Sequence, residues 1–185
     1  MTTEQRGRVL LPIARAAIST ALDRPFAAEE NAAWLREDGA CFVTLTQRGE
    51  LRGCIGSLQA HRPLLEDVKA NALAAAFRDP RFAPLAAAEL DYTEVEISLL
   101  SPLQPLAFFD EQDALAQLRP LVDGIVFEYG HYRSTFLPQV WEQLPEPREF
   151  MAHLKYKAGL SPQFWAEEVR LSRYTVSKWR ESELK

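Results

Sequence analysis

The feature that most constrains the fold is a change of hydrophobic period near residue 41. Upstream of it apolar residues recur at helical spacing, whereas residues 41–46 (CFVTLT) alternate as in a half-buried strand. Residues 47–50 (QRGE) have turn chemistry, and residues 51–57 (LRGCIGS) return as a second strand. The pattern therefore predicts an antiparallel β-hairpin that follows a helical segment.

The rest of the chain mixes helices with strands and has no repeated strand–helix–strand rhythm. This mixture predicts an α+β fold with mostly antiparallel strands. Pro12 lies within the first helical pattern, so that helix is expected to kink there or to begin near it. Trp141, Trp165 and Trp179 are expected in the core of the C-terminal part. Helices are predicted near the N-terminus and at 29–37, 63–77, 110–118, 137–141 and 148–157, and strands at 92–99, 124–129, 132–136 and 170–178.

Two pairings of the hairpin are open, and a slip of one residue exchanges its faces. A four-residue loop would pair Thr46 with Leu51 and put Cys54 on the face of Cys41. A three-residue loop would pair Gln47 with Leu51 and turn Cys54 to the other face, so that no disulfide is expected. We favour the three-residue loop because it gathers four aliphatic side chains on the core side: Val43, Leu45, Leu51 and Ile55.

Cys54 is the main candidate for chemistry. It lies between Gly53 and Gly56, whose missing side chains allow another backbone or a ligand to come close. Arg52 precedes it by two residues on the same strand face, where a cation favours the thiolate. A reactive thiol or an anion site is one interpretation. The other is a small buried hydrophobe, the commoner role of a strand cysteine.

Five further polar residues are candidates for binding. Ser57 ends the hairpin, and Arg133 lies at a tight turn, where ligand contacts are common. Asn71 is a poor helix former within a helix, so its amide either bonds to nearby backbone or is aimed at the hairpin. Asp79 and Arg81 form either a self-contained pair at a helix end or a means of presenting Arg81 to an anion.

The composition and the absence of certain motifs argue against several classes of function. A net charge of −5 gives no general attraction to nucleic acid or to anionic membranes. Two cysteines make no disulfide framework, and no stretch approaches the ~18 apolar residues of a membrane span. The three histidines are too scattered for a zinc pattern, and no nucleotide-binding or nucleophile-elbow motif occurs. We expect a cytoplasmic protein without metal, cofactor, nucleic-acid partner or membrane association.

Several motifs together resemble the AMME chromosomal region (AMMECR) domain family, whose bacterial members are called AmmeMemoRadiSam system protein A. They occur in order between Gly39 and Trp165 and cover most of the chain. The matching segments are ACFVTL, GELRGCIGS, VKANALAAAFRDPRFAPL, EVEISLLSP, DGIVFEYG, RSTFLPQVWEQLP and KAGLSPQFW.

The resemblance implies a single domain over 1–185, with an antiparallel sheet packed by helices and a smaller second lobe. It implies an intracellular location, and a Memo-like protein and a radical-SAM protein as partners. It implies no settled activity. LRGCIG is the hallmark of the family, so a functional role is suspected for Arg52, Gly53, Cys54, Ile55 and Gly56.

Two functional hypotheses follow. The first is an accessory or binding component whose Arg52, Arg81 and Arg133 recognise an anion or an acidic surface. The alternative is a thiol-dependent enzyme or group carrier that uses Cys54 with Arg52 as its electrostatic partner.

Overall fold

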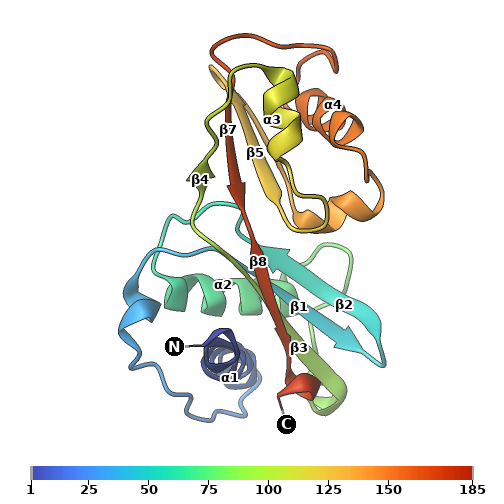
Figure 1. The fold of residues 1–185 in the computed structure, drawn as a ribbon. Coiled ribbons are helices and arrows are strands. Elements are labelled where there is room, and N and C mark those ends of the chain that lie inside the picture. The colour runs from blue at the N-terminus through green and yellow to red at the C-terminus, as the bar shows by residue number, and fades with distance from the viewer. Residues whose placement is uncertain (1, 185) are drawn as a thin grey trace. The chain divides into compact units, whose positions relative to one another are not determined.

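Two four-stranded sheets organise the chain, each in its own unit (Figure 1). The computed structural model describes residues 2–184. The first unit contains the chain up to residue 100 together with the C-terminal residues from 177 onward, and the second contains residues 101–176. Antiparallel strands packed by helices confirm the predicted α+β class.

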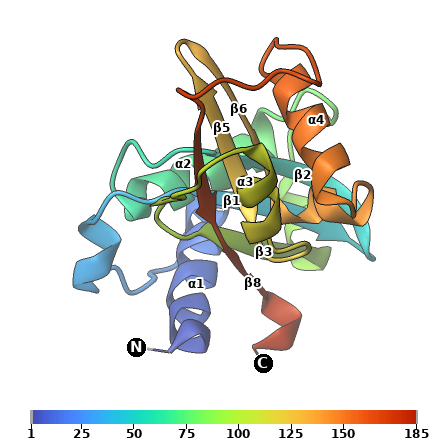
Figure 2. The same cartoon turned by 45° about the horizontal axis from the view of Figure 1, so that its top comes forward.

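The first unit has its sheet in the order β2-β1-β3-β8, and α1 and α2 pack on it. Its core is mainly aliphatic and lies between these helices and the sheet. Figures 1 and 2 both show the C-terminal turn η4 near α1. The elements are α1 (Thr3–Ala21), η1 (Ala33–Arg36), β1 (Cys41–Gln47), β2 (Glu50–Gly56), α2 (Leu64–Phe77), η2 (Ala87–Tyr92), β3 (Thr93–Leu100), β8 (Val176–Arg180) and η4 (Glu181–Glu183).

Helix α1 begins with a capping box and runs through Pro12. The Thr2 side chain accepts a hydrogen bond from the backbone N–H of Gln5, and the Gln5 side chain accepts one from the Thr2 N–H. The helix neither begins nor ends at Pro12, which is exposed. No helix of the described residues is long and apolar enough to cross a membrane.

The hairpin of β1 and β2 contains both of the pairings considered from the sequence. Next to the turn Thr46 pairs with Leu51, but farther along the strands Thr44 pairs with Cys54. A β-bulge separates the two registers, and Arg52 is the extra residue. The three-residue-loop prediction is therefore right at Cys54 and wrong at Leu51, which is 43% exposed instead of buried in the core.

The turn itself has two residues, one fewer than predicted. Arg48 and Gly49 both have positive φ angles, of 52° and 84°. This backbone conformation matches the right-handed twist of two strands joined by a short turn, and glycine adopts it without strain.

The second unit has its sheet in the order β4-β7-β5-β6 and a core of mixed aliphatic and aromatic residues. Trp141 stacks on Phe150 with ring centroids 3.7 Å apart, and its indole N–H donates to the carbonyl of Asp123 at 2.7 Å. The elements are β4 (Gln104–Pro105), α3 (Glu111–Gln117), β5 (Gly124–Tyr129), β6 (Tyr132–Phe136), η3 (Pro138–Glu142), α4 (Pro147–Lys157) and β7 (Arg170–Tyr174).

Three local predictions need correction. The strand expected at 170–178 is two strands, because the chain leaves the second sheet after Tyr174 and enters the first at Val176. Trp179 consequently belongs to the core of the first unit, where its ring fills the space that a Gly7 side chain would need. The helix expected at 29–37 is only the 3-10 turn Ala33–Arg36.

Candidate functional site

Cys54 lies on the strand face opposite to the buried Cys41 and is partly exposed. The Thr44 hydroxyl, directly across the hairpin, donates to its sulfur at 3.3 Å. Its backbone N–H donates to Oδ2 of Asp79 at 2.9 Å, and Arg81 Nη2 donates to its carbonyl at 3.4 Å. We call Thr44, Cys54, Asp79 and Arg81 the Cys54 cluster.

Asp79 and Arg81 follow the end of α2 and form a closely bonded pair. Arg81 donates to the carboxylate from Nε at 3.0 Å, from Nη2 at 2.7 Å and from its own backbone N–H at 3.1 Å. These bonds, with the one from Cys54, hold the pKa of the Asp79 carboxyl well below its usual range. The Arg81 side chain stays 54% exposed, so the pair also presents a guanidinium to solvent.

Arg52 bonds to Glu89 instead of to Cys54. Its Nε and Nη2 donate to the two carboxylate oxygens of Glu89 at 3.0 and 3.1 Å. The Ala86 N–H and the Gln47 amide donate to the same carboxylate. With Arg52 they lower the pKa of Glu89 to about 2. The guanidinium bonded to the Cys54 backbone is therefore that of Arg81, and Arg52 anchors η2 to the bulge in β2.

Phe82 connects the two arginines. The Arg52 and Arg81 Cζ atoms lie 5.8 and 5.5 Å from the centre of its ring, which is within cation–π range. Sequence reasoning missed Phe82, Thr44 and Glu89. The favoured pairing already puts Thr44 opposite Cys54. Glu89 belongs to an EL pair that also matches the family, but nothing in the sequence indicated that it pairs with Arg52, 37 residues away.

The glycines of the hairpin serve packing. A Cβ on Gly53 would lie 2.1 Å from the carbonyl oxygen of Ala75, so this residue lets α2 approach β2. A Cβ on Gly56 would lie 2.2 Å from the ring of Phe42. The sequence left open whether another part of the protein or a ligand comes close to these glycines. At both positions the close neighbour is protein.

Ser57 and Asn71 belong to a buried network around Asp67, apart from the Cys54 cluster. Asp67 is fully buried and accepts from Ser57 Oγ at 2.6 Å, Arg62 Nε at 2.8 Å and the Cys41 N–H at 2.9 Å. The Asn71 amide donates to Asp67, Ser57 and the Cys41 carbonyl. Burial, followed by the Asp67 charge, raises the pKa of the Cys41 thiol.

Arg133 lies in the other unit, on β6. Its Nε is 3.4 Å from a carboxylate oxygen of Glu128 on the neighbouring strand. The structure thus brings Cys54, Asp79 and Arg81 together, whereas Arg133 pairs with Glu128.

In the part of the chain that the structure describes, no metal centre is found and no histidine is hydrogen-bonded to Cys54. No group of three or more His, Cys, Asp or Glu residues there could hold a metal ion. His61 is exposed, and its Nδ1 lies 2.9 Å from the carbonyl of Gln59. The cluster can therefore offer a thiol, a hydroxyl and a guanidinium to a binding partner.

These features define a two-sheet α+β protein with a cysteine hairpin built on an LRGCIG motif. The AMMECR1 family model matches residues 11–179, and the chain belongs to the AMMECR1 family.

Similar proteins span nearly the whole chain. Protein MJ0810 of Methanocaldococcus jannaschii is 35% identical and aligns with 99% of this chain and 94% of its own. A protein of Methanothermobacter thermautotrophicus is 36% identical, with coverages of 97% and 96%. The crystal structure of the uncharacterized protein PH0010 from Pyrococcus horikoshii is similar with a TM-score of 0.75 and 30% identity, covering 96% of this chain and 92% of that one.

Proposed function

We propose that this protein is a cytoplasmic accessory component that binds partner proteins through the Cys54 cluster. In this proposal it corresponds to AmmeMemoRadiSam system protein A, and its partners are a Memo-like protein and a radical-SAM protein. The LRGCIGS and DPRFAPL segments, on which the family resemblance rests, meet in the cluster and support its role as the site. Two free cysteines are in keeping with a reducing compartment.

The observation that best supports a binding role is that both carboxylate oxygens of Asp79 already accept hydrogen bonds. Its carboxylate receives the Cys54 N–H and three donors of Arg81, so it stays ionised and fixed. A carboxylate held in this way is a poor base for a neighbouring thiol. What the cluster presents instead is a preorganised surface with an exposed guanidinium and the flanking Phe82, a combination typical of interface anchors.

One observation favours the alternative, a thiol-dependent enzyme or group carrier. The Thr44 hydroxyl donates to the Cys54 sulfur at 3.3 Å, so a hydrogen-bond donor is already in place beside the thiol. With the Arg81 guanidinium close by, this setting suits thiol reactivity.

Binding to a Memo-like protein tests the proposal. Biolayer interferometry should give a dissociation constant that Arg81→Gln raises about tenfold, as expected for an exposed anchor at an interface. Cys54→Ser should leave that constant within a factor of two. Arg36→Gln, which changes an exposed arginine outside the cluster, is the matched control. An unbound wild type, or an Arg81→Gln variant that binds like Arg36→Gln, contradicts the proposal.

Alkylation of the native protein separates the two functions. The rate at Cys54 is followed against pH by peptide mass spectrometry, with the buried Cys41 as internal control. The binding role predicts a midpoint near the ~8.5 of a free thiol. A midpoint well below that value, together with lost function in Cys54→Ser at unchanged stability, favours the alternative.

A further inference from the structure

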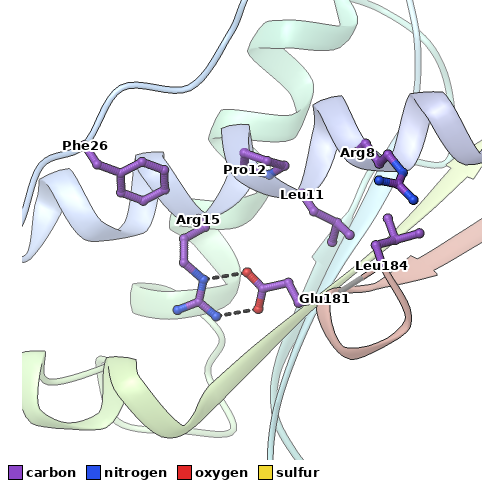
Figure 3. Close-up of a pocket in the computed structure, with 7 residues that line it drawn as sticks. All are labelled: Arg8, Leu11, Pro12, Arg15, Phe26, Glu181 and Leu184. Atoms are coloured by element: carbon purple, nitrogen blue, oxygen red, sulfur yellow. Dashed lines mark hydrogen bonds and ion pairs between the residues drawn. The ribbon is translucent and has the colours of Figure 1, made fainter.

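A cavity of about 400 Å³ opens in the first unit, and none of its lining residues belongs to the Cys54 cluster. Its volume falls within the roughly 300–1,000 Å³ of small-molecule sites. In Figure 3, Phe26 lies at one end, and Arg8 and Leu184 lie at the other. Leu11 and Pro12 of α1 form the apolar wall between these ends.

The charged pair at the base of the cavity is already saturated. Arg15 donates to Glu181 from Nε at 2.6 Å and from Nη2 at 2.5 Å, and it also bonds to the carbonyls of Leu90 and Thr93. Glu181 accepts a further bond from the Val95 N–H. Both side chains are more than three-quarters buried. This pair therefore forms a neutral and fixed base and leaves charge recognition to Arg8.

Arg8 is held much more weakly. Its Nη2 lies 2.8 Å from Glu4 on the same helix, and the two side chains are 60% and 62% exposed. Exposed pairs at this spacing contribute little to stability. A carboxylate delivered by a bound molecule can therefore replace Glu4 at little cost, and it would reach Arg8 beside the apolar wall.

We propose that this cavity binds a small carboxylic acid. Its aliphatic or aromatic body packs against Leu11 and Pro12 between Phe26 and Leu184, and its carboxylate bonds to Arg8. The apolar wall accounts for the body, and the exchangeable guanidinium at one end accounts for the acid. This site is independent of the Cys54 cluster and of the function proposed for it.

Methyl NMR on the full-length protein tests this site. Octanoate is titrated into protein with labelled leucine methyl groups, and octylamine serves as the probe of equal chain length and opposite charge. We expect octanoate to shift the methyl signals of Leu11 and Leu184 and to leave those of Leu171, in the other unit, in place. Octylamine should bind more weakly. No shift of Leu11 and Leu184 up to about 10 mM octanoate, or equal binding of both probes, overturns the proposal.

Two variants test where the carboxylate and the apolar part of the ligand bind. Arg8→Gln should raise the dissociation constant of octanoate about fivefold, as expected for the loss of one half-exposed charge pair. Phe26→Ala should weaken both probes, because it removes one end of the apolar space. Arg78→Gln, an exposed arginine outside the cavity, is the control. All three residues are at exposed positions, so thermal denaturation should show unchanged folding. Arg8→Gln binding octanoate as tightly as Arg78→Gln would refute the assignment of the carboxylate.

Discussion

The Cα hydrogen of Gly53 that a side chain would replace points at α2, and a Cβ there would lie 2.1 Å from the carbonyl oxygen of Ala75. A backbone oxygen cannot move away as a flexible side chain can. We therefore expect Gly53→Ala to lower the free energy of unfolding by about 1–3 kcal/mol, measured by urea denaturation. Gly49→Asn, at the open turn, should cost much less, since asparagine tolerates positive φ. Equal losses of unfolding free energy for the two variants would show that α2 can move away from a side chain at residue 53.

Glu89 gives the stability a specific dependence on pH. Its pKa falls from 4.5 to about 2 in the folded protein, chiefly because Arg52 donates two hydrogen bonds to it. Its contribution is therefore complete above about pH 4.5 and is lost as the pH falls toward 2. The difference in unfolding free energy between wild type and Glu89→Gln should shrink over this interval. The exposed Glu4→Gln is the control, and a difference that is independent of pH would contradict the assignment.

Single residues also show the limits of sequence-based prediction. Cys54 and Gly53 were found because their setting is local: a strand, two glycines and a turn. The partner of Arg52 was not found, because that pairing depends on a bulge and on a carboxylate 37 residues away. Local patterns indicated where the site is, whereas its ion pairs were decided by tertiary contacts.

At the scale of elements, Asp67 joins α2 to both strands of the hairpin. It accepts from the Cys41 N–H, from Ser57 and from Asn71, all of which are donors. Asp67→Asn would turn half of this acceptor into a donor facing other donors, so we expect a loss of about 2–3 kcal/mol. Asp91→Asn, in a largely exposed pair, should stay within about 0.5 kcal/mol. Chemical denaturation of both variants measures these losses. An equally small loss for Asp67→Asn would contradict the role of the Asp67 network in holding α2 to the hairpin.

The elements themselves were largely readable from the sequence. Helix α2 and strands β1, β3, β5 and β6 have clear periods and stop signals, and they form close to the expected residues. The hairpin register was readable only in part, because alternation assumes an unbroken period of two and the bulge at Arg52 breaks it. Likewise, the single strand predicted at 170–178 gave no sign that its two halves join different sheets.

At the scale of the whole molecule, the second unit is continuous in sequence and the first is not. Residues 101–176 have a core of their own around Trp141 and Phe150. We expect this fragment to fold alone, with a cooperative thermal transition in circular dichroism. A fragment of residues 1–100 lacks β8 and the Glu181 partner of Arg15, so it should not fold cooperatively. The opposite pair of results would contradict this division.

The late position of β8 in the chain has a consequence during synthesis on the ribosome. Strand β3 ends at Leu100, but its neighbour in the sheet begins only at Val176. At translation rates of about 5–20 residues per second, an unpaired edge of β3 would persist for on the order of 4–15 s. The intervening residues can fold in that interval. A nascent chain of this protein is therefore most prone to aggregation after β3 and before β8 has been synthesised, when the cell's chaperones would have to shield that edge.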